Sequence, residues 1–234
     1  APKSISMSFI PILHDEDAQE TDTVKERKLE HGCCFVLVDS KGAFAAPESR
    51  KFINKILQPV ELLDNSDLPE EYANILSLAQ GMLPEWNHRA VDFGNIAAPY
   101  LTNRNIVIAT YQQPELVKLA QAMAMILRRY LFRVEIEVLP FSEFSTMQNI
   151  RADLWITNFM VDNLSPHSSL EWLAPDPVFK KLPEQHAGAY QQLQRDLMNV
   201  DIAGSKACVE SFFRGLTEQR WLVPGFHRWL ERQS

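Results

Sequence analysis

The stretch "NIVIATYQQPELVKLAQAMAMILRRYLFRVEIEVLP", Asn105 to Pro140, decides the fold. Its opening "NIVIAT" is a short apolar run that predicts a strand, and the alternating "RVEIEVLP" predicts a half-exposed strand. Between them, Pro114 marks the start of a helix. The apolar residues of this helix recur on one face: Leu116, Leu119, Ala120, Met123, Ile126, Leu127 and Tyr130. A strand, a long helix and a second strand form a βαβ unit with a right-handed crossover, so the chain is predicted to be α/β.

Similar patterns lie on both sides of this unit. We expect strands at "CCFVLVDS" (33–40) and "ADLWITNF" (152–159), and helices over 47–58, 69–80, 187–198 and 207–219. The end of the chain, including "RWLVPGFHRWLERQS", is also expected to be helical. The strands near 35–38, 105–109, 134–138 and 154–157 should share one mixed sheet with helices on both faces. Met123 and Ile126 should then be buried.

Composition narrows the class of protein. A chain of 234 residues with 46% hydrophobic content can bury a sizeable core. Its net charge of −7 provides no general basic field for a nucleic-acid backbone. No apolar run approaches the roughly 20 residues of a membrane span, so we expect no membrane insertion. The first residues turn acidic where a secretory signal would stay apolar, and they lack an initiator Met. We therefore expect a fragment or a processed product.

The chain has three cysteines, an odd number that does not suggest a disulfide framework. Neighbouring strand residues point to opposite faces, so Cys33 and Cys34 are poorly placed to bridge each other or to share a metal. We interpret them as buried thiols of a protein in a reducing compartment.

Catalytic motifs are missing from the sequence. It contains no G-x-S-x-G, Walker loop, G-x-G-x-x-G or H-E-x-x-H pattern, and no histidine pair has metal spacing. We expect no enzyme activity, no cofactor and no metal. Several conspicuous residues have ordinary explanations. Asp15–Asp17 are interpreted as a solvated loop, and Arg128 and Arg129, near Arg133, as cations favoured at a helix C-terminus. Met123 is interpreted as helix packing and Met125 as helix surface. We interpret three tryptophans as core or interface anchors: Trp172, Trp221 and Trp229.

The order of elements resembles the larger lobe of the extracellular solute-binding protein family 5, which includes oligopeptide-binding proteins. The resemblance rests on four stretches between about Glu30 and Leu230, and on a segment near the end. The stretches are "CCFVLVDSKGAFAAPESRKFINKIL", "AQGMLPEW", "NIVIATYQQPELVKLAQAMAMILRRYLFRVEIEVLPFSEF" and "ADLWITNFMVDNLSPHSSL", and the segment is "WLVPGFHRW". Within the family, "HGCCFVLVDS" with "MLPEWNH" and "WLVPGFHRWL" is most similar to the SgrR-like transcriptional regulators of sugar-phosphate stress.

The resemblance implies a periplasmic-binding-protein-like class II lobe. Residues 1–234 would be a single ligand-binding lobe, a fragment of a larger solute-binding-like domain. DNA would be bound only through a winged-helix domain absent from this chain. The implied function is ligand sensing by a cytoplasmic bacterial regulator whose two lobes close on a small solute: a sugar, a sugar phosphate or a peptide-like molecule. The alternative is a periplasmic substrate-binding component of an ABC-type importer. A third, less favoured class is a hydrolase or transferase of unrecognised type.

The resemblance also implies a ligand site. Asp162 matches the family position whose carboxylate meets the α-amino group of a bound peptide, and Pro166 matches the proline four places on. Asn158, Phe159 and Asn163 would line the same rim, because ligands of open α/β sheets collect beyond the carboxyl ends of strands. An ordinary turn aspartate remains the competing interpretation of Asp162. If the chain stops at the hinge between lobes, Phe226 and Trp229 should be partly exposed or lie in a contact.

Overall fold

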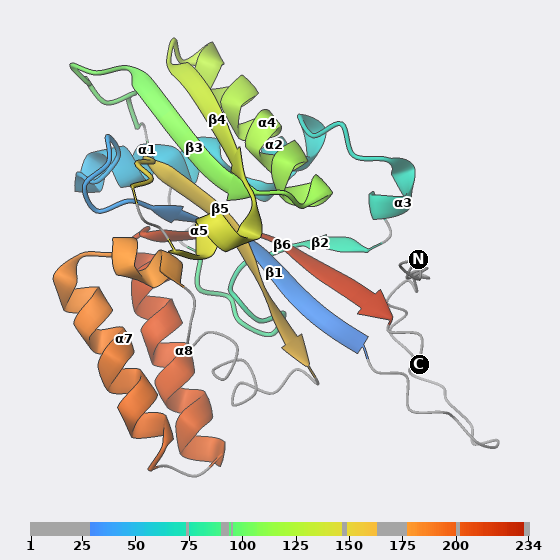
Figure 1. Cartoon of the computed structure of the whole chain (residues 1–234), viewed down its shortest axis with the longest axis vertical. Helices are drawn as coiled ribbons and strands as arrows, with labels where there is room; N and C mark the ends of the chain where they lie inside the picture. Colours follow the sequence, from blue (N-terminus) through green and yellow to red (C-terminus); the bar gives the residue numbers. More distant parts are fainter. Residues whose placement is uncertain are drawn as a thin grey trace.

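A computed structural model describes residues 29–73, 75–89, 94, 96–146, 149–162, 177–199 and 202–231 of the chain. Figure 1 shows a twisted sheet with helices packed around it and a helical pair extending from one end. The sheet has six strands in the order β2-β6-β1-β5-β3-β4. Their bounds are β1 Leu29–Val38, β2 Leu76–Leu78, β3 Asn105–Tyr111, β4 Arg133–Leu139, β5 Leu154–Asp162 and β6 Leu222–Glu231.

The sheet is mixed, as predicted. Strand β3 runs parallel to both β4 and β5, whereas β1 is antiparallel to both β5 and β6. The four predicted strands therefore share one sheet. Helix α4 (Pro114–Arg129) connects β3 to β4, and Met123 and Ile126 are buried at its inner face, so the predicted βαβ unit is confirmed.

Helices cover both faces of the sheet (Figure 1). On one face, α1 (Pro47–Ile56) reaches the end of α4, where the ring of Phe52 meets that of Tyr130 at 5.1 Å. The short α2 (Pro59–Asp64) lies beside them and packs on α4. On the other face, α5 (Phe141–Thr146) and the short helix η1 (Pro177–Lys181) place Phe144 against Trp155 and Phe179 against Phe35. Helices α7 (Glu184–Leu197) and α8 (Ile202–Glu218) pack beyond η1.

Strand β1 lies between β5 and β6 near the middle of the sheet, which explains its continuous apolar sequence. Cys33 and Cys34 are 0% and 2% exposed and both are free thiols. Burial raises the pKa of Cys33 well above its ordinary value and raises that of Cys34 to about 12. The interpretation of this pair as core residues is confirmed.

The predicted helix over 69–80 is wrong in its second half. Helix α3 spans Glu70–Ala73, and Leu76–Leu78 then form β2 at the edge of the sheet. The reason is tertiary pairing: β2 is antiparallel to β6, and the Ala79 amide donates to the Gly225 carbonyl at 3.0 Å. A ladder to a distant strand has outweighed the helical spacing of Ile75, Leu76 and Ala79.

The end of the chain also differs from the expectation. "LVPGFHRWLE" is strand β6, an interior strand between β2 and β1, and it is not helical. Phe226 is 3% exposed, so its expected exposure is wrong, because alternation directs its side chain into the core beneath the sheet. The side chain of Trp229 lies outside the described part, as do Asp15–Asp17 and Trp172. Trp221 is buried, with the Arg50 guanidinium 3.8 Å from its ring centre, in agreement with its expected role as an anchor.

Candidate functional site

The strongest candidate site lies where β3 and β5 separate at their carboxyl ends. The two strands are paired at Ile108 with Leu154 and at Ala109 with Trp155. Beyond these pairs, side chains join the strands: the Thr110 hydroxyl donates to the Ile156 carbonyl at 3.0 Å. In open α/β sheets, ligands bind in the crevice beyond the carboxyl ends of strands, at a point where neighbouring connections diverge. We use the name β3–β5 crevice for this position at the carboxyl ends of the strands, and define it by Thr110, Tyr111, Gln113, Ile156 and Asn158, of which Thr110 and Ile156 are fully buried beneath it.

A chain of hydrogen bonds fixes the polar groups of the crevice. The Tyr111 hydroxyl donates to Asn158 Oδ1 at 2.6 Å, and Asn158 Nδ2 donates to Gln113 Oε1 at 3.4 Å. The Tyr111 ring is held edge-on between Phe141 and Phe144 of α5, each 5.1 Å away between ring centres. Packing and these hydrogen bonds therefore hold the amide and phenol groups in fixed positions.

A buried ion pair lies at the start of α4, just after the crevice residue Gln113. Arg228 of β6 contacts Glu115 of α4 with a nitrogen–oxygen distance of 3.1 Å, and the two side chains are 9% and 8% exposed. Among the described residues, neither Arg228 Nε nor Glu115 Oε2 has a hydrogen-bond partner. The pair also affects nearby groups. Arg228 lowers the pKa of the buried Cys34 thiol, whereas Glu115 raises it. The pKa of the Tyr72 phenol is raised first by burial and then by the charge of Glu115.

The residues proposed for the site from sequence have different outcomes. Asn158 lies in the crevice with its side chain directed at Tyr111 and Gln113. Phe159 and Asp162 belong to β5, which ends at Asp162 opposite Glu30 of β1, but the description gives their backbone alone. Asn163 and Pro166 lie outside the described residues. The ligand-binding roles of Asn158, Phe159, Asp162 and Asn163 therefore stay predictions.

Sequence reasoning missed Tyr111, Gln113, Glu115 and Arg228. For the first three a signal existed, because "YQQPE" places polar groups between the end of a strand and the first turn of a helix, where ligands often bind. For Arg228 the signal was absent. Its role depends on β6 being a strand of this sheet, and its partner Glu115 is far away in the sequence.

Other kinds of site find little support. In the part of the chain that the structure covers, no group of three or more His, Cys, Asp or Glu side chains could hold a metal ion. Within the same residues, no helix has the length and apolar character to cross a membrane. Arg128 and Arg129 bond to the Val134 carbonyl and to the Asn65 side chain, in agreement with their interpretation as helix-end residues.

No family model matches the chain. Several curated proteins described as HTH-type transcriptional regulator SgrR are similar to it, and two of them serve as examples. The one from Photorhabdus laumondii is 24% identical over 224 residues, which are 95% of this chain and 38% of the relative. The one from Yersinia pseudotuberculosis is 25% identical over 241 residues, which are 97% of this chain and 41% of the relative. The chain thus spans about two fifths of the length of these relatives.

A solved structure has the same fold. The dipeptide binding protein of Pseudoalteromonas sp. SM9913, in complex with Met-Leu, superposes with a TM-score of 0.65 at 13% identity. The match covers 88% of this chain and 44% of that chain. The expected solute-binding-protein-like α/β fold is therefore confirmed. The resemblance to the SgrR-like group within solute-binding protein family 5 is confirmed as well, over nearly the whole sequence.

Proposed function

We propose that this chain is the ligand-sensing, solute-binding-like lobe of a bacterial transcriptional regulator. The observation that carries the proposal is the hydrogen-bonded set of polar side chains Tyr111, Asn158 and Gln113 at the carboxyl ends of β3 and β5, in a chain similar to SgrR regulators over 95% of its length. Binding would occur between this lobe and a second lobe. Closure would be favoured by contacts that the ligand makes in the closed state alone.

The ligand would contact Asn158, Phe159, Asp162 and Asn163. Asn158 supports this set because it already links β5 to Tyr111 and Gln113. The carboxylate of Asp162 would accept charge-assisted hydrogen bonds from a cationic ligand group, each contributing about 1.5–3 kcal/mol when shielded from water. We propose a sugar, a sugar phosphate or a peptide-like molecule as the solute.

DNA would be contacted through a domain outside this chain, since the net charge of −7 does not suit a nucleic-acid surface. The protein would be cytoplasmic and would bind its ligand without chemical change. Two buried free thiols in adjacent positions support a reducing compartment, because the oxidising periplasm makes such pairs a liability.

The second candidate is the substrate-binding component of an ABC-type importer. It is favoured by the fold shared with a dipeptide binding protein. The two functions differ in one measurable property. In a regulator, the ligand changes the affinity of the full-length protein for its promoter DNA, whereas an importer component binds ligand with no effect on DNA.

The test uses full-length protein and a panel of sugars, sugar phosphates and peptides in a thermal-shift assay. We expect one class to raise the melting temperature of the wild type, and Asp162→Ala to reduce that shift strongly. Asp64→Ala, a change at an exposed carboxylate at the end of α2, is the matched control and should keep the full shift. An unchanged shift in Asp162→Ala would reduce Asp162 to the last residue of β5, without a role in ligand binding. Turnover of a panel member would instead favour an enzyme.

A further inference from the structure

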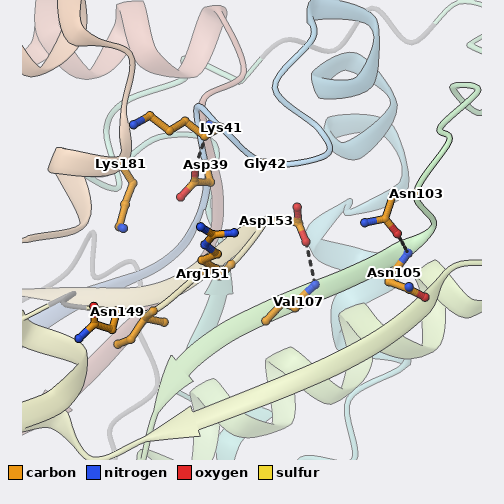
Figure 2. A pocket seen from close by; sticks show the side chains of 12 residues that line it. Asp39, Lys41, Gly42, Asn103, Asn105, Val107, Asn149, Arg151, Asp153 and Lys181 are labelled. Atoms are coloured by element: carbon orange, nitrogen blue, oxygen red, sulfur yellow. Dashed lines mark hydrogen bonds between the residues drawn. The ribbon is translucent and has the colours of Figure 1, made fainter.

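A hollow lies at the opposite end of the strands from the β3–β5 crevice. It has a volume of about 840 Å³ and forms where β3 begins and β1 ends (Figure 2). Lining residues come from the loop after β1, the loop before β3, the segment before β5, and η1. They include Lys41, Asn103, Asn149, Arg151 and Lys181. We call it the amino-edge hollow.

Hydrogen bonds hold the frame of this hollow. Asp153 accepts the Ala43 amide at 2.7 Å through Oδ1 and the Val107 amide at 2.8 Å through Oδ2. At Gly42, a Cβ atom would lie 2.9 Å from the Cα of Asp153, so the loop after β1 approaches the start of β5 as closely as a glycine permits. The hollow therefore has a fixed floor.

The second carboxylate of the hollow is also occupied. Asp39 accepts the Lys41 amide at 2.8 Å through Oδ1 and the Trp155 indole N–H at 2.9 Å through Oδ2. Each oxygen of Asp39 and Asp153 thus accepts an N–H donor of the frame. These bonds fix the positions of both carboxylates, which keep their charge and further acceptor sites.

Three cations line the hollow, and among the described residues none of them forms an ion pair: Lys41, Arg151 and Lys181. Lys181 is restrained, because its ammonium lies 5.0 Å from the centre of the Trp155 ring and its carbonyl accepts the Ser40 amide at 2.9 Å. Figure 2 shows the Arg151 and Lys181 side chains extending into the hollow from different elements.

Two carboxamides add further donors. Asn103 uses Oδ1 to accept the Asn105 amide at 2.9 Å, which leaves its Nδ2 group to donate. Asn149 has a φ of 60°, a left-handed conformation that asparagine tolerates better than most residues, and it lines the hollow beside Arg151. The hollow therefore presents guanidinium, ammonium and amide donors from three cations and two carboxamides, beside the two carboxylates of its frame.

We propose that the amino-edge hollow binds a multiply charged small anion of the phosphate type, at a site separate from the crevice. Its three cations, which form no ion pair with a described residue, outnumber its two carboxylates in a chain with a net charge of −7. A guanidinium is suited to bidentate contact with a phosphate or sulfate oxygen pair, and the lysines supply point charges. The occupant is either free phosphate or the phosphate group of a small organic phosphate.

The test titrates inorganic phosphate into the full-length protein at constant ionic strength, with chloride as the balancing ion, by calorimetry. We expect saturable binding that weakens about tenfold in Arg151→Gln and again in Lys181→Gln, because each change removes one charge-assisted contact. Lys180→Gln is the matched control, since Lys180 is exposed beside Lys181 and does not line the hollow. Lys181→Arg keeps the charge and should retain most of the affinity.

Two further arms complete the experiment. A sugar phosphate compared with inorganic phosphate and with its unphosphorylated sugar, in the wild type and in Arg151→Gln, separates free phosphate from an organic phosphate as the occupant. Thermal unfolding without phosphate checks that each variant folds. Equal affinity in the wild type, Arg151→Gln and Lys181→Gln would overturn the proposal, as would an equal loss in Lys180→Gln, which would mean nonspecific screening. Neither outcome bears on Asp162 or the crevice.

Discussion

Arg228 and Glu115 form a buried ion pair with a nitrogen–oxygen distance of 3.1 Å, and this pair joins β6 to the first turn of α4. Removing one partner leaves the other charge buried without compensation. We expect Glu115→Leu and Arg228→Met each to lower the free energy of unfolding by about 3–5 kcal/mol. The double variant should lose much less than the sum of the two.

The measurement is a double-mutant cycle by urea denaturation at neutral pH. Arg214→Met is the control, because Arg214 pairs with Glu210 on the exposed side of α8 and should cost less than about 1 kcal/mol. If the single variants at Arg228 and Glu115 lower the free energy of unfolding no more than this control does, water must compensate the buried charges.

His227 predicts a pH dependence of stability. Burial lowers its pKa from 6.5 to about 4, so the folded protein holds the imidazole neutral. As the pH falls below about 6.5, the unfolded chain takes up a proton first, and the contribution of His227 to stability is lost progressively until about pH 4. We expect a loss of about 2–3 kcal/mol from this group over that range.

The check compares unfolding free energies of wild type and His227→Gln between pH 4 and pH 7. The variant should have a smaller slope, and His186→Gln, a change at a partly exposed histidine in the first turns of α7, is the control that should keep the slope of the wild type. A His227→Gln slope equal to that of the wild type would remove this explanation and assign the acid sensitivity to carboxylates.

The thiols should differ in reactivity. Cys33 and Cys34 are buried with raised pKa values, while Cys208 on α8 is partly exposed. Because the thiolate is the reactive form, an aromatic disulfide reagent at pH 8 should modify one thiol quickly and all three after unfolding. Cys208→Ser should abolish the fast phase. Fast reaction of two or more thiols in the folded protein would show that β1 opens readily.

Two glycines should respond in opposite ways to alanine. In Gly42→Ala the new Cβ would meet the Asp153 backbone at 2.9 Å, and we expect a loss of about 1–3 kcal/mol. In Gly188→Ala, within α7, nothing lies within 4 Å of the new atom, and the better helix propensity should add about 0.5–1 kcal/mol. Thermal unfolding measures both. A neutral Gly42→Ala would mean that the loop after β1 can move away from β5.

The sequence allowed the βαβ unit to be predicted because its signals are local. Pro114 starts α4, and the apolar stripe through Met123 and Ile126 faces the sheet. β2 and β6 could not be predicted in this way. Leu76 has helical spacing, and Phe226 belongs to a segment with Pro and Gly, yet both lie in strands because distant segments pair with them. Nonlocal hydrogen bonding leaves no periodic signal in either segment.

The candidate site shows the same division. Asn158 was predicted through resemblance and the rule for carboxyl ends of strands, and its side chain accepts a hydrogen bond from Tyr111, while its role in ligand binding stays a prediction. The contacts of Asn158 with Tyr111 and Gln113 depend on how far β3 and β5 diverge, which the sequence pattern does not encode. The cations of the amino-edge hollow come from separate loops, so they were not recognisable as a group in sequence.

The central claim is that the ligand binds at the carboxyl ends of β3 and β5. Hydrogen–deuterium exchange of the full-length protein, with and without the ligand found in the panel, tests it most directly. The account predicts slower exchange in the segments around Tyr111–Glu115 and Asn158–Asp162, with little change around Asn105 at the start of β3. Slower exchange confined to the start of β3, or to α7 and α8, with none around Tyr111 and Asn158, would contradict the claim.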